Sequence, residues 1–175
     1  MFSEKFLRKI KLVEDFQIEI EMPKDEFLKK LPYLVEPSDL GIFSHAFEQF
    51  SSSRTIYKGQ VFPDFFRIRR RRRMFDTSLN LALAEGILKA HGDNTLIDVK
   101  VTGLNGFYKF FPILILGVEA IFLLTFLVSD MPTILIGFML FQTTLFFSIF
   151  YFIMRRGTKA MRYELERDFY FLKKR

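Results

Sequence analysis

Two long apolar runs dominate the pattern of hydrophobic and polar positions along this chain. The first covers residues 110–129, the second covers residues 133–154, and neither contains a lysine or an arginine. A helix of about 20 apolar residues, rising about 1.5 Å per residue, spans the roughly 30 Å hydrocarbon core of a bilayer. Pro132 lies between the runs, where it ends one helix and suits the start of the next. The pattern predicts a transmembrane helical hairpin over residues 108–156.

Shorter patterns fill the residues before these runs. Phe16, Ile18 and Ile20 alternate with polar residues, which is the period of a half-buried strand. Further strands are predicted over residues 55–61, 65–71, 79–90 and 95–101, short helices over residues 3–10, 25–31 and 38–50, and a bulge at Gly86. The predicted fold class is α+β: a small antiparallel β-rich domain over residues 1–107, then the hairpin, then a C-terminal helix over residues 157–175.

The predicted C-terminal helix is amphipathic. Met161, Leu165, Phe169 and Leu172 recur at spacings of three and four residues, and charged residues occupy the remaining positions. Such a stripe packs on the domain, lies on the lipid surface or meets a second subunit, and the sequence leaves these three possibilities open.

Basic residues flank the apolar runs and predict the orientation of the hairpin. Lys109 precedes the first run, and Arg155, Arg156, Lys159 and Arg162 follow the second, whereas the connecting loop carries only Asp130. Lysine and arginine accumulate on the cytoplasmic side of membrane spans. We therefore expect a multi-pass protein of the inner, cytoplasmic membrane with both termini in the cytoplasm.

An arginine-rich segment begins within the strand predicted over residues 65–71. Arginine occupies six of seven consecutive positions: Arg67, Arg69, Arg70, Arg71, Arg72 and Arg73. On a strand these side chains occupy both faces, so we expect the second half of the segment to reach solvent, lipid headgroups or a partner. Three readings stay open: contact with anionic headgroups, binding of an acidic protein, and a solvated edge that blocks aggregation. Nucleic acid is disfavoured, because residues 1–109 carry a net charge of only +3 and contain no recognised nucleic-acid motif.

A polar pair is predicted inside the membrane. Glu119 lies midway along the first apolar run, and Gln142 lies at a comparable distance from the loop on the second. A charged group at the centre of a bilayer costs about 2.5–3.5 kcal/mol on insertion scales, so a polar partner is expected. A hydrogen bond between Glu119 and Gln142 would stabilise the hairpin; alternatively, Glu119 is a proton- or ion-responsive group or contacts another membrane subunit.

Composition narrows the chemistry further. The chain has 175 residues, a net charge of +6, 24 phenylalanines, no cysteine and only two histidines. This excludes a thiolate site and disfavours a multi-histidine metal centre, and His45 with Glu48 forms only two of the ligands that a metal needs. No nucleophile elbow, phosphate-binding loop or metalloprotease motif is present. We expect neither enzymatic activity nor a metal or cofactor.

Part of the chain resembles a known class of proteins. The stretch 57–70, the residues Glu85-Gly86-Ile87 and the stretch 92–99 are similar to those of small, functionally uncharacterised bacterial two-pass membrane proteins. Those proteins pair a β-meander, loosely like a pleckstrin-homology sheet, with two membrane helices and an acidic-aromatic C-terminal helix. The resemblance implies the same fold here and no particular activity.

These observations favour a non-enzymatic adaptor or assembly subunit of a bacterial membrane complex. Its expected partners are membrane lipids and either another membrane protein or further copies of itself. An immunity or inhibitor protein against a membrane-directed toxin, a homo-oligomeric ion- or proton-responsive protein, and a small lipid-modifying enzyme are the alternatives.

Overall fold

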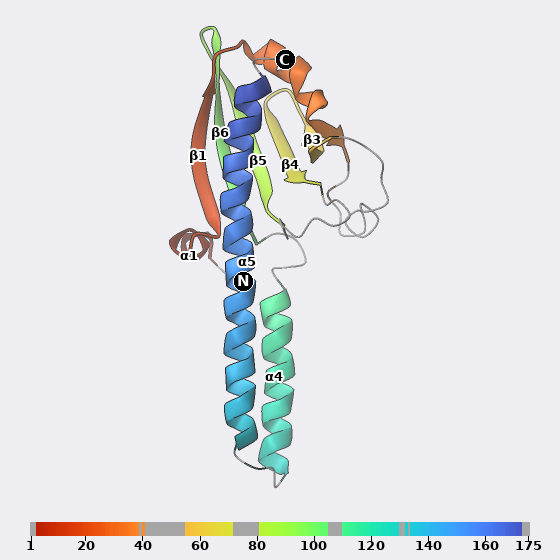
Figure 1. Cartoon of the computed structure of the whole chain (residues 1–175), viewed down its shortest axis with the longest axis vertical. Coiled ribbons are helices and arrows are strands. Elements are labelled where there is room, and N and C mark those ends of the chain that lie inside the picture. The colour runs from red at the N-terminus through yellow and green to blue at the C-terminus, as the bar shows by residue number, and fades with distance from the viewer. Residues whose placement is uncertain are drawn as a thin grey trace.

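The computed structural model describes residues 3–38, 40, 55–71, 81–104, 110–129, 132 and 134–172. These residues form an α+β fold in which a six-stranded mixed sheet is crossed by a long C-terminal helix (Figure 1). The elements in chain order are α1 (Glu4–Lys9), β1 (Val13–Ile20), α2 (Lys24–Lys30), the 3-10 turn η1 (Leu31–Tyr33), β2 (Val35–Pro37), β3 (Tyr57–Val61), β4 (Phe65–Arg70), β5 (Leu83–His91), β6 (Asn94–Thr102), α4 (Phe111–Val128) and α5 (Ile134–Leu172). The helix predicted over residues 38–50 lies outside the described residues.

The sheet is mixed, although the sequence predicts an antiparallel one. Its strand order is β1-β6-β5-β4-β3-β2, and every neighbouring pair is antiparallel except β2 and β3. Strand β2 runs parallel to β3, with Val35 opposite Tyr57. It has only three residues and ends at Pro37, so it is too short to show an alternating pattern.

The predicted bulge at Gly86 is wrong. Gly86 pairs in regular register with Phe66 on β4 and with Val99 on β6. A Cβ atom at this position would lie 2.2 Å from Cζ of Phe66, so the glycine leaves room for that ring. The ring in turn packs edge-on against Phe169 of α5, with centroids 5.7 Å apart. Gly86 therefore serves the packing of the helix on the sheet.

Helix α5 belongs to two environments. It is continuous through 39 residues, which is about 58 Å at 1.5 Å per residue. In its C-terminal half, Met161, Leu165, Phe169 and Leu172 are at most 1 % exposed and lie in the main core between helix and sheet. The predicted C-terminal helix is present, and its apolar stripe packs on the domain rather than on lipid or a second subunit.

A second, smaller core joins the N-terminus of the domain to the middle of α5. Leu7 and Leu12 pack with Met154, and the hydroxyl of Tyr151 donates a hydrogen bond of 3.2 Å to the carbonyl of Ile10. Lys11 ends α1 with φ of 58°, in the left-handed region that favours glycine. These contacts hold α1 beside the helix at the end of the domain nearest α4 (Figure 1).

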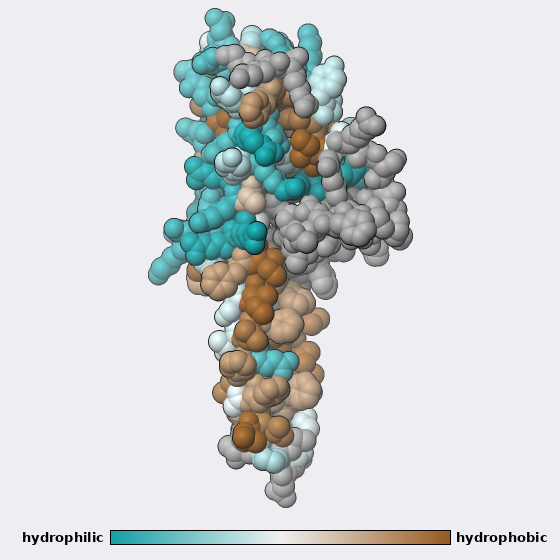
Figure 2. Space-filling view, in the orientation of Figure 1, coloured by the Kyte–Doolittle hydropathy of each residue, from teal (hydrophilic) through white to brown (hydrophobic). Residues whose placement is uncertain are grey.

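The other half of α5 lies outside the domain, next to α4. Most of the large apolar side chains in this part are exposed, and Figure 2 shows it as a predominantly brown stem below a mainly teal domain. Among the described residues, α5 is the one helix long and apolar enough to cross a membrane, and none of its most apolar 18-residue stretch is buried. The apolar stretch of α4, Phe111–Phe126, is shorter. By this criterion there is one span, where the sequence predicts two.

Candidate functional site

A broad groove crosses the face of the sheet opposite α5. Its volume is about 1130 Å³, and strands β1, β3, β4, β5 and β6 all contribute lining residues. Three large apolar side chains in it are exposed: Phe62 at 41 %, Phe65 at 47 % and Ile87 at 55 %. The rings of Phe62 and Phe65 stack with centroids 4.4 Å apart, and Phe65 lies opposite Ile87 in the sheet. Together these three residues form an apolar patch on a rigid β-surface.

Ion pairs neutralise the carboxylates that line the groove. Their side-chain partners come from neighbouring segments: Asp15 with Arg8, Asp64 with Lys24, Glu85 with Arg67, and Asp98 with Lys89. Hydrogen bonds from Lys89 and Gln17 hold the pKa of Asp98 below its ordinary value. A carboxylate whose pKa is lowered, as that of Asp98 is, is unsuited to act as a general acid. An apolar centre with a balanced polar rim instead suits binding of another apolar surface.

The β3–β4 turn places the apolar patch at a definite position in the molecule. The ion pair between Lys24 of α2 and Asp64, 2.6 Å long, ties this turn to the end of the sheet that lies away from α4 (Figure 1). Sequence patterns did not single out Phe62, Phe65 or Ile87. One sequence feature could have indicated the patch: Phe62 and Phe65 lie on either side of Pro63-Asp64, and a turn rarely needs two large aromatic side chains.

Two of the described arginines in the arginine-rich segment are buried, and the prediction that its second half reaches solvent, lipid headgroups or a partner is wrong for Arg71. Arg69 is 4 % exposed and Arg71 is 3 % exposed. Arg71 pairs with Glu36 of β2 at 2.9 Å, and Arg70 pairs with Glu164 of α5. The physical reason is that β4 lies inside the sheet, where guanidinium groups meet carboxylates from other elements. Arg67 remains half-exposed on the open face, while Arg72 and Arg73 lie outside the described residues.

A buried polar contact links β3 to α5. The Tyr57 hydroxyl donates a hydrogen bond of 2.8 Å to Asp168, whose other carboxylate oxygen is 2.9 Å from the Arg167 guanidinium. Tyr57 is fully buried and Asp168 is 8 % exposed. Burial and the Asp168 charge strongly raise the pKa of Tyr57. The sequence feature that could have indicated this contact is Asp168, because a carboxylate beside Phe169 on the apolar face of the helix needs a polar partner.

Glu119 makes a polar contact between α4 and α5. The Thr143 hydroxyl lies 2.5 Å from the Glu119 carboxylate and 2.9 Å from the Met139 carbonyl. Thr143 takes the place that the sequence suggested for Gln142, which is exposed one position earlier on α5. Nearer the domain, Phe111 stacks on Phe150 with centroids 5.5 Å apart. These contacts hold the two apolar helices together at two levels.

The basic residues after the second apolar run fall into two groups. Arg162 donates to Glu166 at 3.0 Å, lies 3.7 Å from Glu14, and has its pKa raised by these carboxylates. Arg155 lies 6.0 Å from the centre of the Tyr151 ring. The side chains of Arg156 and Lys159 are exposed. Lys109, the basic residue before the first run, lies outside the described residues.

Comparisons with known proteins give no relative from which a role could be transferred. No protein-family model, curated protein sequence or solved structure matches this chain. In the part of the chain that the structure describes, no group of three or more histidine, aspartate or glutamate side chains is placed to hold a metal ion. The assignment of function therefore rests on geometry alone.

Proposed function

We propose that this chain is a two-pass protein of a bacterial inner membrane and acts without catalysis, as an adaptor or assembly subunit of a membrane complex. In this proposal α4 and the N-terminal half of α5 insert as an antiparallel hairpin, and the sheet domain and both termini are cytoplasmic. The partner is another membrane protein, which docks a cytoplasmic apolar segment into the groove on the open face of the sheet.

The continuity of α5 is the observation that carries the proposal. Among the described residues none of its most apolar 18-residue stretch is buried, and its other half contributes Met161, Leu165 and Phe169 to the core of the sheet domain. An exposed apolar surface of this length on a soluble protein would aggregate, whereas in a bilayer it is solvated by lipid. One unbroken helix therefore supports a domain held at a fixed height and orientation on the membrane.

The companion helix α4 supports the second pass. Its 18 residues extend about 27 Å, close to the thickness of a hydrocarbon core. Helices that face lipid associate through packing and polar contacts. Helix α4 makes one contact of each kind with α5: Glu119 contacts Thr143, and Phe111 stacks on Phe150. Because only five residues separate the end of α4 from the start of α5, an antiparallel pair is favoured.

The groove supports the docking role. Phe62, Phe65 and Ile87 expose apolar area on rigid strands, and aromatic side chains surrounded by a polar rim are the usual anchors of protein interfaces. The ion pairs around them leave little net charge to recognise a charged small molecule. Because this face lies opposite α5, a partner can reach it while the domain stays anchored.

Purification of the tagged full-length protein from its native membrane tests this function. The protein is extracted in mild detergent, the particle mass is measured and every subunit is identified. We expect a stoichiometric foreign membrane subunit that is lost from the double variant Phe65→Ser with Ile87→Ser. Tyr33→Ser, which changes an exposed aromatic residue outside the groove, should retain it.

Two results would contradict the proposal, one its docking site and the other the adaptor role itself. A foreign subunit that stays bound to the groove variant would show that the groove is not the docking site. A particle built only from copies of this chain would instead favour the homo-oligomeric alternative. In that case Glu119, which lies half-buried between the helices, would be the residue to examine as a proton- or ion-responsive group.

A further inference from the structure

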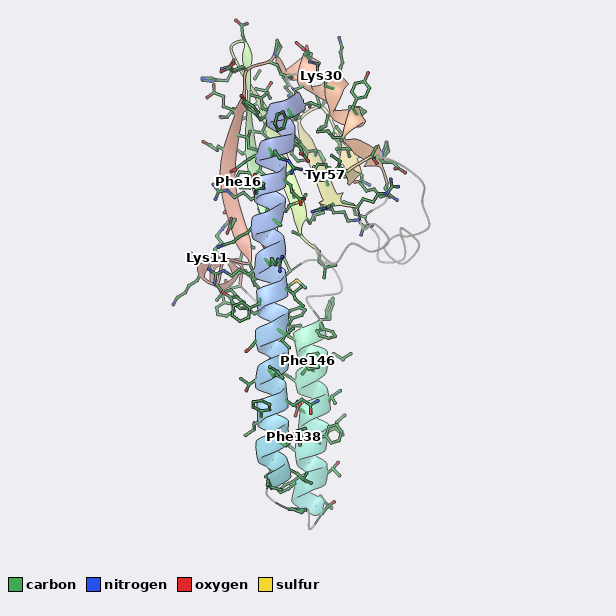
Figure 3. The ribbon with its side chains drawn as sticks, viewed as in Figure 1. Lys11, Phe16, Lys30, Tyr57, Phe138 and Phe146 are labelled. Carbon is green, nitrogen blue, oxygen red and sulfur yellow. The ribbon has the colours of Figure 1, made fainter. Side chains whose placement is uncertain are left out.

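The junction between the apolar stem and the sheet domain gathers basic side chains from the two ends of the chain. Lys5 and Lys9 lie on α1, Lys11 follows that helix, and Arg155, Arg156 and Lys159 lie on α5. We call these six residues the basic collar. The contact of Leu7 with Met154 and the hydrogen bond from Tyr151 to Ile10 fix the two segments at one level. Figure 3 shows Lys11 beside α5 on this side of the domain.

The side chains of the collar have no acidic partners among the residues that the structure describes. In the part of the chain that the structure describes, none of its six side chains lies within 4.0 Å of a carboxylate. The nearby carboxylates are already used: Glu4 and Asp15 pair with Arg8 and Lys100, and Glu14 pairs with Arg162. Lys100 and Arg8 hold the pKa of Glu4 below its ordinary value, so it stays ionised with these partners. The collar therefore keeps its positive charge for a ligand outside the chain.

The α5 side of the collar borders a hollow with apolar walls. Arg155, Arg156 and Lys159 line a depression of about 550 Å³ together with Phe152, Ala160 and Tyr163. Phe152 is 64 % exposed and Tyr163 is 66 % exposed, on either side of the basic residues. Aromatic side chains beside lysine and arginine at the end of an apolar span are typical of the headgroup layer of a bilayer. A molecule with an anionic head and an apolar tail matches both parts of this surface.

We propose that the basic collar binds the phosphate headgroups of anionic phospholipids and so fixes the sheet domain against the inner leaflet. The proposal rests on the membrane location in the proposed function and assigns the lipid contact to α1 and α5 instead of the arginine-rich strand. The anionic inner leaflet attracts basic residues held close to it. Contact on two sides of α5, through α1 and through the depression, would resist tilting of the domain about the helix.

Lipid binding by the full-length protein in detergent tests the collar. The probes are dioleoyl phosphatidylglycerol and dioleoyl phosphatidylcholine, and native mass spectrometry measures the bound lipid. We expect at least tenfold tighter binding of the anionic lipid, weakened by salt. The double variant Arg156→Gln with Lys159→Gln should lose at least fivefold of this preference, as should Lys5→Gln with Lys9→Gln. The matched control is Lys29→Gln with Lys30→Gln on α2, at the far end of the domain, and should not change it (Figure 3).

Three results would overturn the proposal. These are equal affinity of the native protein for the two lipids, an unchanged preference in both collar variants, and displacement of bound lipid by 10-fold excess inorganic phosphate. Carbonate extraction of native membranes separates this failure from failure of the proposed function. A protein that resists extraction but lacks the preference contradicts the collar alone, whereas a protein released by carbonate contradicts the membrane location itself.

Discussion

The Tyr57 hydroxyl and the Asp168 carboxylate form a buried hydrogen bond of 2.8 Å between residues 111 positions apart. Tyr57 lies on β3, near the edge of the sheet, and Asp168 lies in the last turns of α5. This contact and the pair between Arg70 and Glu164 attach the C-terminal half of the helix to the neighbouring strands β3 and β4. The orientation of the sheet on the helix therefore depends on polar contacts as well as on the core.

Replacement of Tyr57 by phenylalanine tests this attachment. The change leaves Asp168 buried with Arg167 as its remaining side-chain partner, and a lost hydrogen bond to a charged group costs about 1.5–3 kcal/mol. We expect the free energy of unfolding of the full-length protein in detergent to fall by that amount. The control is Tyr33→Phe, at a position that is 71 % exposed. Its free energy of unfolding should differ from that of the native protein by no more than about 0.5 kcal/mol.

The same tyrosine predicts a pH dependence. Its pKa is raised above the ordinary value of 10.0 by burial and by the Asp168 charge. Above about pH 10 the unfolded chain releases this proton and the folded chain keeps it, so unfolding is favoured by about 1.4 kcal/mol per pH unit. The stability difference between the native protein and Tyr57→Phe should therefore shrink between pH 10 and pH 11. A constant difference across this range would show that Tyr57 titrates normally.

Gly86 should not tolerate a larger residue. A Cβ atom there would meet the Phe66 ring at 2.2 Å, and the ring cannot move away without disturbing its contact with Phe169. We expect Gly86→Ala to lower the free energy of unfolding by about 1–3 kcal/mol, which is measured as a lower melting temperature. Gly137→Ala, where open space surrounds the new methyl group on α5, is the matched control and should be neutral or stabilising. Equal melting temperatures for the two variants would contradict the packing described here.

The contact between Glu119 and Thr143 should contribute to hairpin stability. Polar contacts between membrane helices are worth about 0.6–2 kcal/mol, so Glu119→Leu and Thr143→Val should each weaken the hairpin by a similar amount. Glu119→Gln keeps a polar partner for Thr143 and should be close to native. Steric trapping measures the stability of the hairpin in each single variant and in the double variant. If the two losses of stability simply add in the double variant, the two residues do not interact.

Lys11 occupies a backbone conformation that suits glycine, with φ of 58°. Lys11→Gly should raise the stability of the domain by about 0.5–1 kcal/mol, because the strain at the end of α1 is relieved. The same change removes one charge from the basic collar and should weaken binding of phosphatidylglycerol. Thermal unfolding and lipid titration of this single variant measure both effects. Lower stability would contradict the assigned backbone strain.

Local patterns were sufficient to predict much of the architecture. The alternation at Phe16, Ile18 and Ile20 marks a real strand, and the stripe from Met161 to Leu172 marks the helix face in the core. Both are visible because a strand or helix repeats its buried positions at a fixed period. The three-residue β2 has no such repeat, and its position depends entirely on pairing with β3.

The candidate sites were harder to predict, because their partners are distant in sequence. Arg71 is buried only because Glu36 reaches it from β2, and Asp168 is tolerated in the apolar stripe only because Tyr57 meets it. Adjacent residues of a helix point about 100° apart, so the rotation of α5 about its axis decides whether Thr143 or Gln142 faces Glu119. Periodicity within one helix does not reveal that rotation. Likewise, α1 and the middle of α5 form one basic collar through tertiary packing alone.

Single-cysteine labelling tests the central claim most directly, namely that α4 and α5 form a membrane hairpin continuous with a cytoplasmic domain. The chain contains no cysteine, so each introduced residue is the only reactive site. In intact cells, a membrane-impermeant maleimide should label Ser129→Cys at the end of α4, and should label Tyr33→Cys in the domain only after lysis. Labelling of Tyr33→Cys in intact cells, or protection of both positions until lysis, would contradict this account.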